Sequence, residues 1–252
     1  MISYFNCRTY IPFISESFGF DAGKLSFAGK NTGGDLGYSF VEIDKEQSKS
    51  LNRPFGRYIS FEPDIDFFGE EASKNKVIKA LSEAFILLNG GRLKNALIVG
   101  LGNSRITADS LGAATCKPLL QSNDFKVLLP DVGAVTGIDS FDIVQSVCRK
   151  IKPSAVVVCD TLSSEKIERL GRCFQLTDSG IAAGSGIGNL SLRLSKETLG
   201  VNVIVVGVPL VIYAKKICAS SPVSDMVLTP SNIDYLVNGL GDIIGNAIKI
   251  AV

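Results

Sequence analysis

The sequence of 252 residues contains no histidine. Its absence excludes the Ser-His-Asp and Cys-His arrangements of nucleophilic catalysis, and it excludes zinc sites that need an imidazole ligand. Acid–base chemistry near neutral pH must therefore come from carboxylates, lysine, tyrosine or a metal-bound water.

The sequence also lacks an excess of positive or negative charge. Its 26 Lys and Arg residues nearly balance its 25 Asp and Glu residues, and the formal net charge is +1. This balance gives no electrostatic reason to expect direct contact with nucleic acid or with a membrane surface. The longest apolar stretch, around residues 201–214, is too short to span a bilayer and contains Pro209. No basic region followed by an apolar run marks the N-terminus as a signal peptide, so we expect a cytoplasmic protein.

The sequence also lacks any CxxC pair, and its six cysteines are scattered along the chain. We expect them to be reduced and mostly buried, as in a cytosolic protein. They are Cys7, Cys116, Cys148, Cys159, Cys173 and Cys218.

What the chain does contain is organised around a strand, a turn and a carboxylate. Residues 96–99 form a short apolar run, typical of a strand buried on both faces, and Gly100 and Gly102 allow a sharp turn after it. Thr107 is expected to cap the next helix, which places Asp109 in its first turn. The third glycine of a dinucleotide-binding loop is missing, so the turn does not indicate a nucleotide site.

A second unit repeats this design, because residues 155–159 form an apolar strand and Asp160 is expected to end it. Ligands bind beyond the carboxyl ends of strands in open α/β sheets, so we expect Asp109 and Asp160 to face each other across one cleft. Two close carboxylates can share a proton and act as base and acid. On the residues alone, a structural role for these aspartates is slightly favoured over a catalytic one.

Apolar periodicity predicts the remaining elements. Strands are expected at residues 37–43, 57–61, 126–129, 173–177 and 203–207, and helices at residues 74–89, 140–151, 165–170 and from residue 229 onward. Strands that alternate with helices indicate a largely parallel sheet covered on both sides. We therefore expect a single domain over residues 1–252, with an irregular β-containing N-terminal region over residues 1–71 and an α/β core over residues 72–252.

A glycine-rich segment, residues 178–189, follows one of the predicted strands. Such loops present backbone N–H groups to a substrate, although a flexible connection is the alternative. The segment and the turn after residues 96–99 are expected to hold the substrate backbone. The residues assigned to this role are Gly100, Gly102, Asn103, Asp178, Gly184, Ser185 and Gly186.

Seven segments in order along the chain together resemble one family, the germination proteases of endospore-forming bacteria. They read RTYIPFISES, GRYISFE, VGLGNSRITADSLG, PDVGAVTGIDS, KPSAVVVCDTLSS, TDSGIAAGSGIGN and LSKETLGVNVIVVGVP. The resemblance implies a spore endopeptidase that degrades small acid-soluble spore proteins when germination begins. It also implies a three-layer α/β/α sandwich of the phosphorylase/hydrolase-like kind, related to the hydrogenase-maturation proteases, made as a zymogen and assembled as a homotetramer in the spore core.

The family's two essential aspartates fall on Asp109 and Asp160, which the resemblance therefore makes the catalytic residues. We expect no cofactor, although a divalent metal held by Asp109 and Asp160 stays open, as do two alternative functions. One is a metal-dependent processing protease of the hydrogenase-maturation type, and the other is a catalytically silent paralogue that binds spore proteins. The chain departs from the family pattern at four positions, which are Ala108, Ala182, Ala183 and Tyr213.

Overall fold

The computed structural model describes residues 36–51, 53–64, 66–120, 122, 124–182, 192–217 and 226–252. Its centre is a sheet with strand order β1-β2-β6-β9-β5-β3-β4, and a short strand, β10, pairs with β9. The strands of this sheet are β1 (Leu36–Ile43), β2 (Gly56–Pro63), β3 (Leu97–Gly100), β4 (Lys126–Leu128), β5 (Ala155–Ser164), β6 (Phe174–Thr177), β9 (Asn202–Tyr213) and β10 (Val227–Leu228). A separate two-stranded ribbon joins β7 (Ile181–Ala182) to β8 (Arg193–Leu194).

The parallel half of the sheet consists of β4, β3, β5 and β9. Its strands are continuous apolar runs because helices cover both faces. The prediction that Asp160 ends its strand was wrong, because β5 continues to Ser164 and Asp160 lies inside it, opposite Gly207 of β9. On the other side of β5, β3 stops at Gly100. The second half of β5 therefore pairs with β9 alone, and this pairing across the chain set the strand's length.

The remaining strands turn the sheet into a mixed one. β6 runs antiparallel to β9, β2 runs antiparallel to β6, and β1 forms a hairpin with β2. The β-containing N-terminal region thus extends the central sheet at one edge. The predicted α/β fold class, with a largely parallel central sheet flanked by helices, is confirmed.

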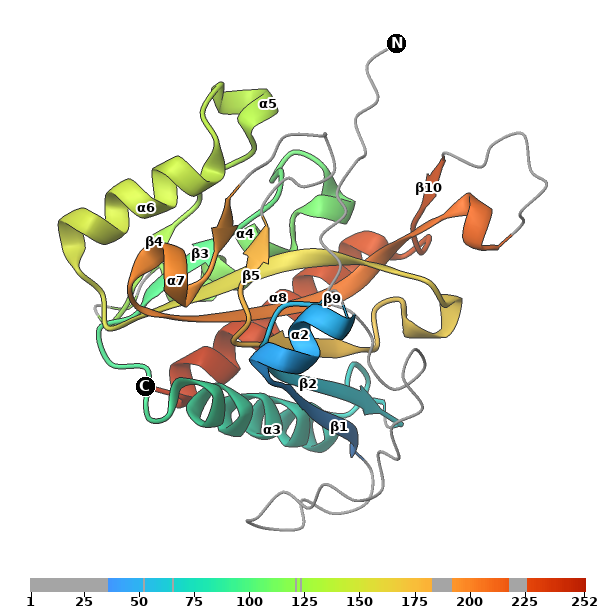
Figure 1. Cartoon of the computed structure of the whole chain (residues 1–252). Helices are drawn as coiled ribbons and strands as arrows, with labels where there is room; N and C mark the ends of the chain where they lie inside the picture. Colours follow the sequence, from blue (N-terminus) through green and yellow to red (C-terminus); the bar gives the residue numbers. More distant parts are fainter. Residues whose placement is uncertain are drawn as a thin grey trace.

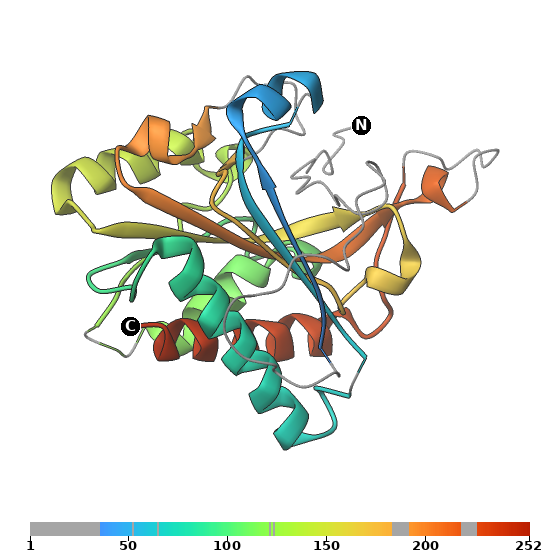
Figure 2. The ribbon, with the colours of Figure 1, turned by 60° about the horizontal axis from the view of Figure 1, so that its bottom comes forward.

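Helices form a layer on each side of the sheet (Figures 1 and 2). The helices α3 (Glu71–Asn89), α4 (Leu111–Cys116) and α8 (Ile233–Ile250) bury their apolar stripes in one core cluster. On the opposite face, α6 (Ser140–Ile151) and α7 (Lys196–Leu199) pack against a second cluster. The short elements are α2 (Lys45–Leu51), α5 (Gly133–Thr136), and the 3-10 turns η2 (Thr107–Asp109), η3 (Lys117–Leu119), η4 (Ile167–Arg169) and η6 (Ala214–Lys216).

The ends of the helices were predicted from the sequence less well than their interiors. Gly90 ends α3 in the left-handed conformation, with φ of 74°, as expected for a glycine after a helix. In contrast, the cap of α6 is Asp139, whose carboxylate accepts the Phe141 N–H at 2.8 Å. Ser140, the first residue of the helix expected over residues 140–151, instead donates its hydroxyl to the Asp131 carbonyl at 2.8 Å. Two adjacent residues could each cap the helix, and the contact with the loop after β4 decided between them.

Among the described residues, no helix is both long and apolar enough to cross a membrane. The four cysteines in this part of the chain are free and buried, as predicted. Cys7 and Cys218 lie outside the described residues.

Candidate active site

Asp109 lies in the turn that leaves β3. The Asn103 backbone N–H donates to Asp109 Oδ2 at 2.8 Å, and this bond closes the loop between β3 and η2. Gly102 makes the closure sterically feasible, because its φ is +95° and a Cβ there would run into the Asp109 carbonyl oxygen. The predicted capping role of Thr107 was wrong, since Asp109 ends a 3-10 turn and α4 begins only at Leu111.

The environment of Asp109 raises the pKa of its carboxyl group to about 6. Burial is the main cause because it disfavours the charged form, and the hydrogen bond from Asn103 acts in the opposite direction. The carboxylate of Asp131 raises the pKa further. A carboxyl group with a pKa of about 6 exchanges protons readily near neutral pH, which is the property that general acid–base catalysis requires.

Asp160 is held rigidly in β5, with only 2% of its surface exposed. Its Oδ1 accepts the Thr161 backbone N–H at 2.8 Å. The Asp160 side chain also has interactions other than this hydrogen bond. A buried carboxylate in the middle of a parallel sheet is costly, and such groups are most often retained at functional sites.

Asp160 lies within β5 next to the point where the neighbouring strand β3 ends, and Asp109 lies in the turn that follows β3. Gly100 lies opposite Cys159, the Leu101 N–H donates to the Cys159 carbonyl at 2.9 Å, and Asp160 is the next residue. The 3-10 turn that ends in Asp109 packs against β5 and β9. The expectation that both carboxylates line one cleft stays a prediction. So does the role of Gly100, Gly102 and Asn103 in holding substrate, although all three lie in the turn beside these strand ends.

A third acid, Asp131, was missed by the sequence reasoning. It follows β4, the strand next to β3, and its carboxylate acts on the pKa of Asp109. Its backbone is left-handed, with φ of 60°, which aspartate tolerates better than most residues. Its position in the sequence could have revealed it. Asp131 follows the strand β4, just as the turn that carries Asp109 follows the neighbouring strand β3.

Asp178 lies at the other edge of the sheet. It follows β6, which runs opposite to β9, so the chain leaves β6 near the amino end of β9. The Arg57 side chain and backbone bind its carboxylate, with Nε 2.7 Å from Oδ2 and the backbone nitrogen 2.6 Å from Oδ1. The structure therefore does not bring Asp178 together with Asp109 and Asp160. The other expected substrate-binding residues, Gly184, Ser185 and Gly186, lie outside the described residues.

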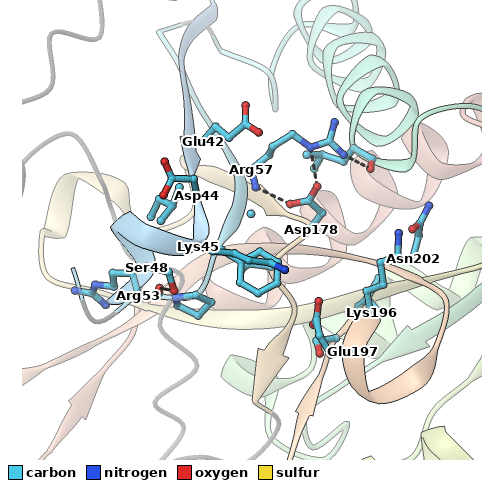
Figure 3. A pocket seen from close by; sticks show the side chains of 18 of the residues that line it. Glu42, Asp44, Lys45, Ser48, Arg53, Arg57, Asp178, Lys196, Glu197 and Asn202 are labelled. Carbon is cyan, nitrogen blue, oxygen red and sulfur yellow. Dashed lines mark hydrogen bonds and ion pairs between the residues drawn. The ribbon is translucent and has the colours of Figure 1, made fainter. Parts of the chain in front are cut away.

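Asp178 instead lines a cavity of about 1020 Å³ between β2, α2, α7 and the end of α3. Figure 3 shows the Arg57–Asp178 pair on one side of this cavity and Lys196 with Glu197 on another. The cavity lies beside Asn202, where β9 begins, whereas Gly207 lies opposite Asp160. Five residues of extended strand separate these two levels, a distance of about 17 Å along the strand.

The described residues contain no group of three His, Cys, Asp or Glu side chains that could hold a metal ion. Asp109 and Asp160 would supply carboxylate oxygens only, and two such residues are fewer than an all-protein metal site uses. We derive no catalytic step through a metal.

The sequence model of the germination protease family matches residues 27–228. The chain belongs to the germination protease family. The germination protease of Clostridium perfringens (strain SM101 / Type A) is 29% identical in an alignment that covers 90% of this chain and 87% of the relative.

Other germination proteases are longer than this chain. That of Bacillus licheniformis is 34% identical over 220 residues, covering 80% of this chain and 57% of the relative. That of Priestia megaterium is 32% identical over 222 residues, covering 81% of this chain and 57% of the relative. Membership of the family identifies the chain as an endopeptidase, a hydrolase of peptide bonds, as the sequence motifs predicted.

One solved structure with a related arrangement is the [NiFe] hydrogenase maturation protease HycI from Thermococcus kodakarensis KOD1. It is 18% identical, with a TM-score of 0.43, and the match covers 66% of this chain and 99% of HycI.

Proposed function

We propose that Asp109 and Asp160 together activate the water molecule that hydrolyses the peptide bond. The observation that carries this proposal is the position of Asp109 in a turn that packs against β5, the strand of Asp160; burial there raises the pKa of Asp109 to about 6. A carboxyl group of this kind is protonated in a useful fraction of molecules near neutral pH. No histidine is available for the same task.

In this scheme the two carboxyl groups have different roles. Asp109, whose pKa is raised, carries the proton and donates it to the leaving amine. Asp160, oriented by the Thr161 N–H, accepts a proton from the attacking water. Proton donation and acceptance by placed side chains each contribute roughly 10²–10⁴-fold to a rate.

The proposed substrates are small acid-soluble spore proteins, and the proposed place of action is the spore core. The support is family membership, because proteins named germination protease match most of this chain. The homo-oligomeric assembly and the zymogen stage that the resemblance implies belong to the same proposal.

The experiment is cleavage of a purified small acid-soluble spore protein, followed by gel electrophoresis and mass spectrometry. Asp109→Asn and Asp160→Asn keep side-chain shape and remove the ionisable group, so each should lower kcat at least about 10²-fold. Asp142→Asn, at an exposed position of α6, is the matched control and should keep wild-type activity. Circular dichroism checks that each variant is folded.

Near wild-type activity in either aspartate variant would remove that residue from the mechanism. The same assay with a chelator separates the metal-dependent alternative, since complete loss of activity restored by Mn²⁺ would place a metal between the same two residues. A wild-type chain that binds the spore protein without cutting it would be the silent paralogue.

A further inference from the structure

The cavity of about 1020 Å³ beside Asp178 has no part in the chemistry proposed for Asp109 and Asp160. It opens at the amino edge of the parallel strands, where its lining residue Asn202 lies about 17 Å along β9 from Gly207, the residue opposite Asp160. Its volume is at the upper end for ligand pockets of proteins. A group bound there could reach the two aspartates only as part of an extended molecule.

The lining of this cavity carries an excess of positive charge. Four of its ten charged side chains are acidic, and two of these are already engaged: Asp178 binds Arg57, and Asp44 caps α2 by accepting the N–H groups of Glu46 and Gln47. The six cationic side chains are Lys45, Lys49, Arg53, Arg57, Arg193 and Lys196.

In this count the charges of the Arg57–Asp178 pair cancel, and so do those of Arg53 and Asp44. Two acids then remain, Glu42 and Glu197. Four cations oppose them, which are Lys45, Lys49, Arg193 and Lys196. The side chains that line the cavity thus carry two more positive charges than negative ones, although the whole chain has a formal net charge of only +1.

Arg193 shows that the excess is built into the fold. The side chain is half-buried, and Nη2 donates to the Gly180 carbonyl at 2.6 Å and to the Ser179 carbonyl at 3.3 Å. Within the described part of the chain, no carboxylate lies at ion-pair distance from it. Desolvation lowers the pKa of Arg193, while the charges of Tyr58 and Glu197 act in the opposite direction. A half-buried guanidinium that has no carboxylate partner among the described residues favours an incoming anion.

The cavity also offers apolar surface next to its cations. Phe55 is 39% exposed, and Lys45 Nζ lies 5.5 Å from the centre of its ring. Figure 3 shows Lys45 extending from α2 toward the space between Asp178 and Glu197. Aromatic and apolar surface with a few charged groups around it suits a peptide better than it suits an inorganic ion.

We propose that this cavity is a second binding site, which takes a polypeptide segment carrying acidic side chains. The acidic groups bind Lys45, Lys196 and Arg193, and the segment's apolar atoms contact Phe55. In an endopeptidase, such a site holds one part of a long substrate while another part reaches the catalytic edge, and the second contact raises the overall affinity. The site is built from residues other than the two aspartates, so it can be tested separately from the proposed mechanism.

The test uses the full chain and a short fluorescein-labelled peptide that alternates glutamate and serine. Fluorescence anisotropy measures its binding, and mass spectrometry checks that the peptide stays intact. A peptide with glutamine in place of glutamate and inorganic phosphate are the two comparison ligands. The double variant Lys45→Gln with Lys196→Gln should weaken binding of the glutamate peptide about tenfold, as expected for the loss of two charge contacts. Lys150→Gln with Lys249→Gln removes the same charge from exposed positions on α6 and α8 and should leave the affinity unchanged.

Three results would overturn the proposal. The first is equal weakening by both double variants, which would mean that net charge alone attracts the peptide. The second is equal affinity for the glutamate and glutamine peptides. The third is tight binding of phosphate at the same lysines without binding of the peptide, which would make the cavity a small-anion site. Asp109→Asn should bind the peptide as the wild type does, so a failed mechanism and a failed binding site give different results.

Discussion

Asn103 and Asp109 join the two ends of one turn, because the Asn103 backbone N–H lies 2.8 Å from Asp109 Oδ2. The carboxyl group proposed to donate a proton in catalysis therefore also fixes the shape of the loop that carries it. Burial raises its pKa to about 6, while this hydrogen bond limits the rise. The same carboxyl group thus holds the turn together and takes part in the proposed reaction. Its protonation should therefore change both the free energy of unfolding and the rate of peptide cleavage.

The first prediction concerns stability and pH. Because the pKa of Asp109 is raised from 3.8 to about 6 on folding, the protonated form favours the folded state. This contribution is fully present below pH 3.8 and is lost as the pH rises through about 6, which amounts to about 3 kcal/mol in the free energy of unfolding. Urea unfolding across this range should show that Asp109→Asn lacks this loss. Parallel curves for wild type and variant would show that Asp109 has an ordinary pKa.

The second prediction concerns rate and pH. If Asp109 donates a proton, kcat should fall as the pH rises above about 6, because the ionised carboxylate has no proton to give. Steady-state cleavage of a spore protein in buffers of constant ionic strength measures this profile. A rate that falls below pH 6 instead would exchange the roles of the two aspartates, with Asp109 as the base.

The third prediction concerns Gly102. Gly102→Ala adds a Cβ that meets the Asp109 carbonyl and imposes a side chain on a backbone with φ of +95°. We expect loss of roughly 1–3 kcal/mol of stability and a larger loss of activity, because the turn must move and takes Asp109 with it. Gly137→Ala is the matched control, since its φ is +74° but no atom lies within 4 Å of the added Cβ. Equal effects of both variants would mean that backbone strain alone, and not the contact with Asp109, matters.

The fourth prediction concerns the Arg57–Asp178 pair. Its side chains are 30% and 22% exposed, and Arg57 also donates to the carbonyls of Leu87 and Leu88, at the end of α3. Asp178→Asn should lower the free energy of unfolding by about 1–3 kcal/mol, because it leaves a half-buried guanidinium without its counter-charge. A double-mutant cycle with Arg57→Ala, followed by urea unfolding, measures the coupling. Unchanged stability with a raised KM would restore the substrate-binding role that the sequence suggested for Asp178.

The sequence predicted the parts of this fold that depend on local pattern. Apolar runs located β3, β5 and β9, and Gly90 marked the end of α3. The length of β5 was missed because it depends on pairing with β9 far along the chain. The same applies to the site, since Asp109 and Asp160 stand out after apolar runs, whereas Arg57 and Asp178 are 121 residues apart and no local pattern connects them. Asp131 was missed because a single acid in a loop has no periodicity.

The pairing of β5 with β9 also sets the order in which the molecule can be completed during its synthesis. Asp160 lies in the sheet only when Gly207 of β9 lies opposite it, and every residue of η4, β6, β7, β8 and α7 is made before β9. Parallel pairing of such distant segments is slow, because the loop between them must close first. A chain still emerging from the ribosome therefore carries Asp160 before β9 exists to hold it in the sheet, so the proposed catalytic pair cannot be complete until β9 is made.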